Sequence, residues 1–235
     1  MKKDKIGVII PAGGSGSRMG GVYKPLEMLC GKPMLCYSLE TFENCADVDF
    51  VVVSAKDDKI SEIEKLCKEF SFSKVKVVVR GGADRQKSVE NAFRCGLFDD
   101  EKIGYVAIHD AARPMFDENM AEKVFAMAKK MGNAVCACKV RDTIKKTDDN
   151  NVVCGDVDRD SLWLIQTPQV FDKKLYEKAL DYANVMGFVA TDDSSLVKNL
   201  GEKVYLCETP SYNFKVTYPE DIFMAEAVLR HREGR

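Results

Sequence analysis

Several features are missing from this chain of 235 residues, and each absence excludes a class of protein. No run approaches the roughly 18 consecutive apolar residues that a transmembrane helix needs. The basic start Met1–Lys5 precedes an apolar stretch, Val8–Ile10, that is too short for a secretory signal peptide. The sequence shows no internal repeat and no low-complexity linker. We therefore predict a cytoplasmic protein whose residues 1–235 form a single domain.

The chain also lacks a large excess of charge of one sign, and it is poor in histidine. The formal net charge is −2, and acidic and basic residues are interspersed, which argues against a nucleic-acid partner bound by bulk electrostatics. The chain has 9 cysteines but only 2 histidines and no Cys-x-x-Cys pair, so a zinc site is poorly supported. Cys136 and Cys138 lie two residues apart and share one face of a strand. We interpret the cysteines as free, buried thiols in a reducing compartment.

Apolar, β-branched runs alternate with amphipathic helical stretches along most of the chain. The predicted strands are Gly7–Pro11, Phe50–Ser54, Val75–Arg80, Tyr105–His109, Asn133–Val140 and Lys203–Cys207. The predicted helices are Met34–Asn44, Lys59–Phe70, Arg85–Gly96, Glu118–Met131, Lys173–Val185, Ser194–Leu200 and Glu220–Arg232. This alternation predicts an α/β fold, with a Rossmann-like, mostly parallel sheet that has helices on both faces. Ligands of such sheets bind at the carboxyl ends of strands.

The segment from about 141 to 165 departs from this alternation. A stretch rich in Lys, Asp and Asn, residues 145–151, precedes the apolar pieces 152–154 and 162–164. Short strand-like pieces around an Asp-Asn turn predict a hairpin, and hence a β-arm that projects from the core. Leu162 and Trp163 on this arm would pack either on a second subunit or back on their own domain, and we favour a homodimer.

The most informative segment follows the first predicted strand and begins Ala12-Gly13-Gly14-Ser15-Gly16-Ser17-Arg18. Glycines after an apolar strand let polyphosphate oxygens approach backbone N–H groups closely. Arg18 and Lys24 add positive charge where phosphoryl or nucleotidyl transfer builds up negative charge. The spacing fits neither the G-x-G-x-x-G dinucleotide motif nor a Walker A loop. The alternative interpretation is a flexible glycine turn with two chance cations.

Further polar segments follow predicted strands or lie late in the chain. They are Gly81–Ser88, His109–Pro114, Arg141–Thr143, Thr191–Asp193 and Asn213–Thr217. Each by itself could be a helix cap or a surface ion pair. Because the carboxyl ends of parallel strands meet at one edge of a sheet, the whole set favours a single ligand site there.

In order and spacing, these motifs resemble those of the 2-C-methyl-D-erythritol 4-phosphate cytidylyltransferases of the non-mevalonate isoprenoid pathway. The resemblance runs from about Ile6 to Glu226 and also rests on Asp158-Arg159, Leu162-Trp163, Gln166–Gln169 and Lys215–Thr217. It implies an enzyme in which a polyol phosphate oxygen attacks the α-phosphorus of CTP in line and pyrophosphate leaves. Such catalysis rests on positioning and on neutralising charge at phosphorus.

The resemblance also implies roles for single residues. Arg18, Lys24 and Lys215 would be catalytic, through contacts with the triphosphate. CTP would be bound by Ala12, Gly13, Gly14, Gly16, Gly82, Arg85 and Ser88. The polyol phosphate would be bound by Asp110, Thr143, Arg159, Thr167 and Thr191, with Thr143 and Arg159 reaching across on the arm of a partner subunit. Mg²⁺ is expected mainly on the CTP phosphates, and no direct metal ligand is assigned.

The chain departs from the family pattern near the loop. Tyr23-Lys24-Pro25-Leu26 stands where the family usually has a Lys-Gln pair, and the spacing from Arg18 is one residue shorter. The Ala-Gly-Gly form at Ala12 is similar to that of the sister ribitol 5-phosphate cytidylyltransferases. Two alternatives therefore stand beside the main hypothesis: a ribitol 5-phosphate cytidylyltransferase, and a catalytically silent nucleotide-binding homologue.

Overall fold

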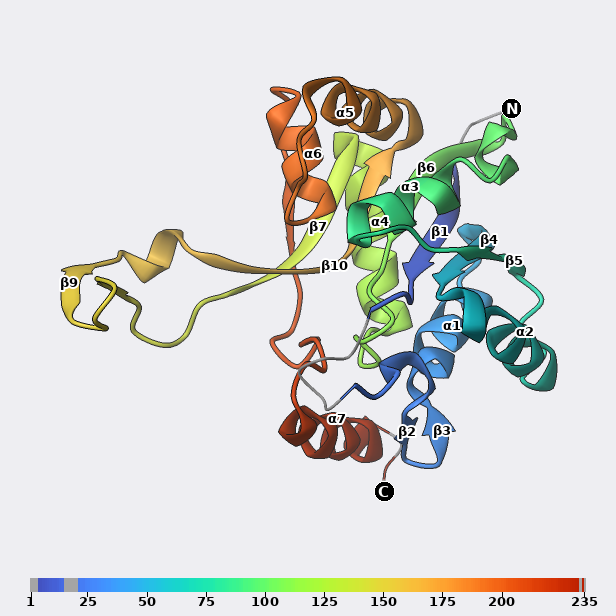
Figure 1. The fold of residues 1–235 in the computed structure, drawn as a ribbon, viewed down its shortest axis with the longest axis horizontal. Helices are drawn as coiled ribbons and strands as arrows, with labels where there is room; N and C mark the ends of the chain where they lie inside the picture. The colour runs from blue at the N-terminus through green and yellow to red at the C-terminus, as the bar shows by residue number, and fades with distance from the viewer. Residues whose placement is uncertain (1–3, 15–20, 233, 235) are drawn as a thin grey trace.

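A seven-stranded sheet forms the centre of the protein in a computed structural model, which describes residues 4–14, 21–232 and 234 (Figure 1). Its strands are β1 (Lys5–Pro11), β4 (Val48–Ala55), β5 (Val75–Arg80), β6 (Ile103–Ile108), β7 (Asn133–Lys139), β10 (Trp163–Asp172) and β11 (Leu206–Glu208). They lie in the order β11-β7-β10-β6-β1-β4-β5. All neighbours are parallel except β10, which runs antiparallel to both β6 and β7. The predicted mostly parallel sheet is confirmed.

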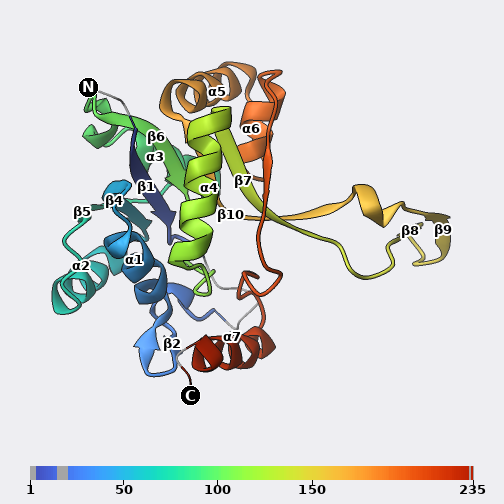
Figure 2. The same ribbon diagram turned by 180° about the vertical axis from the view of Figure 1, so that it is seen from behind.

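Helices cover both faces of this sheet, as predicted. One face carries α1 (Met34–Asn44), α2 (Ile60–Glu69) and α4 (Glu118–Met131), and its core contains residues such as Leu35, Ile63 and Val124. The other face carries α3 (Arg85–Phe93), α5 (Lys173–Met186) and α6 (Asp193–Asn199), whose core contains Val89, Tyr176 and Leu196. The helix α7 (Pro219–Arg232) packs on the small hairpin of β2 (Met28–Leu29) and β3 (Lys32–Pro33) (Figure 2).

A second hairpin, β8 (Lys145–Thr147) with β9 (Val153–Asp156), lies far from the sheet and extends to one side of the molecule (Figures 1 and 2). The chain reaches it from β7 and returns through β10. Its side chains are mostly exposed, including Val152 and Val153. We call residues 141–162, with this hairpin at their end, the arm.

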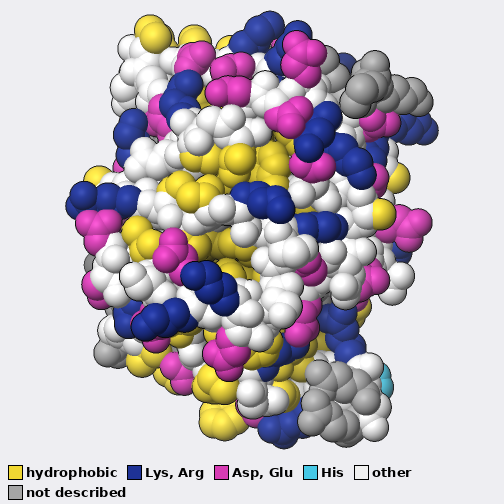
Figure 3. All heavy atoms as spheres, turned by 90° about the vertical axis from the view of Figure 1, so that its right-hand side faces the viewer, with side chains coloured by type: hydrophobic (Ala, Val, Ile, Leu, Met, Phe, Trp, Pro, Cys, Tyr) yellow, Lys and Arg dark blue, Asp and Glu magenta, His cyan; other side chains and the backbone are white. Residues whose placement is uncertain are grey.

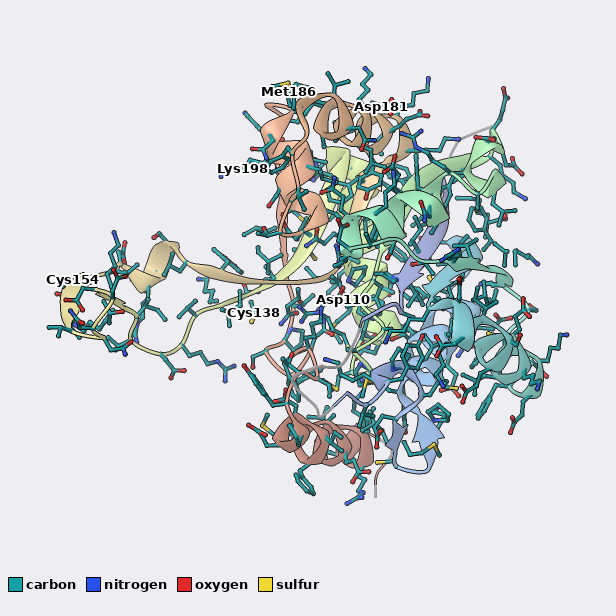
Figure 4. The ribbon with its side chains drawn as sticks, viewed as in Figure 1. Asp110, Cys138, Cys154, Asp181, Met186 and Lys198 are labelled. Carbon is teal, nitrogen blue, oxygen red and sulfur yellow. The ribbon has the colours of Figure 1, made fainter. Side chains whose placement is uncertain are left out.

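The structure corrects three of the sequence interpretations. Trp163 and Leu164 were expected in the hairpin, but they begin β10 and pair with Lys139 and Cys138 of the central sheet. Not every cysteine is buried: Cys154 is exposed on β9, well away from the body of the molecule (Figure 4). The last strand is Leu206–Glu208 rather than Lys203–Cys207.

The surface shows no segregation of charge on the face that bears α2 and β5. Lysine, arginine and acidic side chains are interspersed there around a band of hydrophobic side chains (Figure 3). Within the part of the chain that the structure describes, none of the helices has the length and apolar character to cross a membrane.

Candidate functional site

A cavity of about 430 Å³ opens at the carboxyl ends of β1, β5 and β6. It is lined by Pro11, Ala12, Gly13, Gly14, Lys24, Pro25, Gly82, Ala83, Asp84, Arg85, Ser88, Asp110, Ala111, Ala112 and Lys215. Segments that are distant in the sequence therefore meet where the strand–helix alternation predicted a ligand site.

The wall after β5 is built by the segment that opens α3. Asp84 caps this helix by accepting a hydrogen bond from the Lys87 N–H at 2.7 Å. The Ser88 hydroxyl accepts from the Gly82 N–H at 2.9 Å and donates to the Asp84 carbonyl at 2.7 Å. A Cβ atom on Gly82 would come within 2.5 Å of the Lys87 side chain, so the tight loop requires glycine. Internal hydrogen bonds therefore hold the shape of this wall.

One carboxylate on the cavity wall is surrounded by cations. Asp110 accepts from Arg85 Nε at 3.1 Å through Oδ1 and from Lys215 Nζ at 3.0 Å through Oδ2. Arg113 Nε lies 3.6 Å from the same Oδ2. Burial favours the neutral acid, but these three cations outweigh it and hold the pKa of Asp110 well below its usual range. Asp110 is therefore ionised and fixed at both oxygens (its position is shown in Figure 4).

Behind the wall, Arg85 contacts a second carboxylate. Its Nη1 donates to Asp193 Oδ2 at 2.7 Å, and Asp193 Oδ1 accepts from the Tyr176 hydroxyl at 2.7 Å. Burial lowers the pKa of Arg85, but the carboxylates of Asp193 and Asp110 more than compensate and raise it above its ordinary value. The guanidinium is thus a permanent cation held between two acids.

A buried histidine fixes the start of the segment that carries Asp110. His109 is fully buried, with Nε2 3.2 Å from Ser38 Oγ and Nδ1 3.2 Å from Thr167 Oγ1. Burial lowers the pKa of His109 to about 3, so the ring is neutral near pH 7. The Thr167 hydroxyl also accepts from the Asp110 N–H at 3.0 Å. Thr167, expected to bind substrate, is 3% exposed and bonded to these protein groups.

The predicted catalytic lysines reach the cavity from opposite ends of the chain. Lys24 begins the 3-10 helix Lys24–Leu26, with Pro25 in its first turn, and its Nζ donates to the Val216 carbonyl at 3.3 Å. Lys215 directly precedes Val216 in the chain. The Lys24-Pro25 departure from the family pattern therefore still places the lysine at the cavity.

The remaining predicted residues lie elsewhere. Thr143 and Arg159 are exposed on the arm, where Arg159 Nη1 donates to the Arg141 carbonyl at 2.9 Å. Thr191 is exposed just before α6, with its Oγ1 3.4 Å from Ser195 Oγ. Gly16 and Arg18 lie outside the described residues.

Sequence reasoning missed two residues of the charged network. Tyr176 lies within a helix whose pattern indicates only core packing, and Asp193 was not separated from its neighbour Asp192. No sequence signal singles out Tyr176. The doubled acid at the start of α6 was a signal for Asp193, because one carboxylate suffices to cap a helix.

The described residues contain no group of three or more His, Cys, Asp or Glu side chains arranged to hold a metal ion. Asp84 and Asp110 are the acidic residues among those that line the cavity. Both are already engaged, one in the helix cap and the other with three cations.

Comparison with known proteins gives a consistent result. The family model described as IspD, 2-C-methyl-D-erythritol 4-phosphate cytidylyltransferase, matches residues 6–231. Curated proteins of that name from Lysinibacillus sphaericus and Halalkalibacterium halodurans are 38% and 39% identical, covering 96% and 97% of this chain and 96% and 98% of their own lengths. The crystal structure of 4-diphosphocytidyl-2C-methyl-D-erythritol synthase from Anaerococcus prevotii superposes with a TM-score of 0.83 at 29% identity, covering 97% of this chain and 100% of that one.

Proposed function

Since the chain belongs to the 2-C-methyl-D-erythritol 4-phosphate cytidylyltransferase family, we propose that the cavity at the carboxyl edge of its sheet is the site of that family's reaction. The enzyme joins CTP and 2-C-methyl-D-erythritol 4-phosphate, giving the CDP-methylerythritol product and pyrophosphate, in isoprenoid precursor biosynthesis. Full-length similarity to relatives of this name favours this function over a ribitol 5-phosphate enzyme or a silent homologue.

The observation that carries this proposal is the meeting of two lysines with a glycine-lined wall in one cavity. Lys24 and Lys215 bring positive charge to the same cavity in which Gly13 and Gly14 leave the backbone accessible. In-line attack of the polyol phosphate oxygen on the α-phosphorus needs little proton transfer, so fixed cations that neutralise growing charge supply most of the catalysis. We assign Lys24, Lys215 and Arg18 to the triphosphate of CTP.

The rest of the cavity suits recognition of a nucleoside and a polyol. Ala12, Gly13, Gly14 and Gly82 line the cavity with small side chains or none, so their backbone groups are accessible to a small pyrimidine ring. Ser88 and Arg85 fix the shape of the cavity wall from α3. We assign these residues, with Gly16, to CTP, and Asp110 to hydroxyl groups of the ribose or the methylerythritol.

Magnesium fits this site as a companion of the triphosphate. Mg²⁺ keeps several water ligands and binds through substrate phosphates and one or two carboxylates, so a dedicated protein cage is not required. The two acidic residues that line the cavity are engaged with protein groups, which leaves the CTP phosphates as the main ligands. Bound there, the ion neutralises phosphate charge.

We further propose that the arm completes the site of a second subunit in a homodimer. Thr143 and Arg159 lie on the arm outside their own cavity, and the arm exposes Val152 and Val153 to solvent. In a dimer, the Arg159 guanidinium would bind the substrate phosphate in the neighbouring cavity, with Thr143 and Thr191 as hydroxyl partners and Thr167 behind them.

Mixing two inactive variants tests this arrangement. Arg159→Ala and Lys24→Ala each impair a different element of the shared site, so a mixed dimer regains one intact site and up to about a quarter of wild-type activity at equal mixing. Pyrophosphate release after subunit exchange, with molar mass by light scattering, is the measurement. A monomer at micromolar concentration, or no recovery on mixing variants that do exchange, contradicts the dimeric site.

The function itself is tested by pyrophosphate release from CTP and Mg²⁺ with two acceptors compared side by side. We expect 2-C-methyl-D-erythritol 4-phosphate to be preferred over ribitol 5-phosphate in kcat/KM by at least about tenfold, the scale of a few hydroxyl and methyl contacts. Activity should vanish with EDTA and return with excess Mg²⁺. Preference for ribitol 5-phosphate, or CTP binding without turnover, would refute the assignment.

A further inference from the structure

A buried acid that lies outside the cavity holds the cavity's arginine in place. Asp193, the first residue of α6, is 1% exposed, and both of its carboxylate oxygens are used. Oδ1 accepts from the Tyr176 hydroxyl and Oδ2 from Arg85 Nη1, each at 2.7 Å. Tyr176 is itself fully buried on α5 and packs against the rings of Phe93 and Phe171. Asp193 is therefore fixed from the core side.

The Nε group of Arg85 makes the contact at the cavity. It donates to Asp110 Oδ1 at 3.1 Å, and Asp110 Oδ2 accepts from Lys215 Nζ at 3.0 Å. A continuous series of alternating charges thus runs from the core to Lys215, which is assigned to the triphosphate of CTP. Arg85, Asp110 and Lys215 line the cavity, whereas Asp193 and Tyr176 lie behind it.

The position of Asp193 is set by a second, independent anchor on α6. Asp192 caps this helix by accepting from the Ser195 N–H at 3.0 Å, and its other oxygen accepts from Gln169 Nε2 at 2.8 Å. The Gln169 side-chain oxygen in turn accepts from the Ser194 N–H at 2.8 Å. Since Gln169 is buried within β10, the first turn of α6 is tied to the central sheet.

We propose that Asp193, held by Tyr176, is a positioning residue for cytidylyl transfer: it fixes Arg85 so that Asp110 keeps one oxygen for Lys215. This inference rests on the function proposed above. An arginine held only by Asp110 would be free to turn about this one contact and to bind both oxygens of that carboxylate through Nε and Nη2 as a bidentate pair. The contact of Lys215 with Oδ2, which aims its ammonium group at the reaction site, would then be weakened. Asp193 holds Nη1 and so fixes the orientation of the guanidinium, which keeps Nε on Oδ1.

The test compares two buried carboxylates, each changed to its neutral amide of the same shape. Asp193→Asn should lower kcat by about 10- to 100-fold, the scale of one lost hydrogen bond between charged groups. The KM for CTP should change much less, because the proposal acts through Lys215 at the reacting phosphorus. Glu90→Gln is the control: Glu90 is 5% exposed on the same helix as Arg85 and pairs with Lys87 and Arg94 away from the cavity. Its kcat should stay near wild type.

A double-mutant cycle separates positioning from a general loss of structure. In an Arg85→Gln background, Asp193→Asn should change kcat by less than about twofold, because its effect passes through Arg85. Tyr176→Phe, which keeps the ring and removes the hydroxyl, should lower kcat by about 3- to 10-fold with a small change in Tm. If Asp193→Asn fails to fold, the Tyr176→Phe kinetics decide the question alone.

The outcomes distinguish this inference from the function on which it rests. Wild-type protein that releases no pyrophosphate would overturn the proposed function. An active wild type with unchanged kcat in folded Asp193→Asn, or with equal losses in the presence and absence of Arg85, would overturn the positioning role alone. A loss in Glu90→Gln as large as that in Asp193→Asn would do the same.

Discussion

Replacing Lys24 with alanine should lower kcat by about 10²- to 10³-fold, the scale of one lost preorganised donor at a developing oxyanion. Lys24 lines the cavity beside Lys215, and its ammonium group donates to the backbone carbonyl of Val216 at 3.3 Å. This contact holds the lysine in place before CTP arrives, so little reorganisation accompanies the reaction. The measurement is steady-state pyrophosphate release at saturating CTP and polyol phosphate.

Two comparisons make this result specific. Lys65→Ala removes an exposed lysine on α2, a helix that contributes no residue to the cavity lining, and should leave kcat within about twofold. Arg18→Ala should resemble Lys24→Ala, because the same triphosphate charge would lose a partner. Near wild-type turnover in Lys24→Ala would show that the lysine after the glycine-rich loop is not catalytic.

The location of this site could be predicted because it depends on features that are local in the sequence. Strands such as Val75–Arg80 and helices such as Glu118–Met131 have strong apolar periodicity, and their observed bounds agree with the predicted ones. Parallel strands then bring their carboxyl ends together, so Lys24, Asp110 and Lys215 meet without any need to know their side-chain geometry.

The antiparallel strand β10 could not be predicted from such periodicity. Its centre, Gln166-Thr167-Pro168-Gln169, is polar and contains a proline, which resembles a loop. These residues are buried because their polar groups bond inside the protein. Gln166 bonds to Thr209 and Asn213, and Gln169 bonds to Asp192. Partners 23 to 47 residues away in the sequence compensate the cost of burying amides, and no local pattern shows them.

The different roles of the neighbouring residues Asp192 and Asp193 could not be predicted from the sequence either. Asp192 and Asp193 are identical side chains in adjacent positions, yet the first caps α6 and the second pairs with Arg85. A helix turns about 100° per residue, so neighbouring side chains face different surroundings. The sequence predicts that one acid caps the helix, but tertiary packing decides what the other contacts.

Asp110→Asn should be the most destabilising single change at the site, lowering the free energy of unfolding by about 3–5 kcal/mol, the cost of leaving buried charges without a partner. Asp110 accepts from Arg85 and from Lys215 through different oxygens. An asparagine offers one acceptor oxygen, so its NH₂ group would face one of these cationic donors. Arg113 is buried, and its Nε lies 3.6 Å from Asp110 Oδ2. It would lose the same neutralising charge.

The matched control is Asp47→Asn at the surface. Asp47 pairs with Lys129 at 2.6 Å, but its side chain is 44% exposed, so the change should cost less than about 1 kcal/mol. Urea unfolding at pH 7 of wild type and both variants measures the difference. Equal losses in Asp110→Asn and Asp47→Asn would mean that the cations around Asp110 do not depend on its charge.

The same carboxylate predicts how stability depends on pH. The pKa of Asp110 in the folded protein lies below its ordinary value of 3.8, because Arg85, Lys215 and Arg113 outweigh the effect of burial. The unfolded chain therefore binds the proton first as pH falls, and the stabilisation that is complete well above pH 3.8 declines below it. In Asp110→Asn this contribution is absent at every pH, so the stability difference from wild type should shrink as pH falls from 5 to 3. A difference that stays constant over that range would show that the variant loses packing rather than a charge.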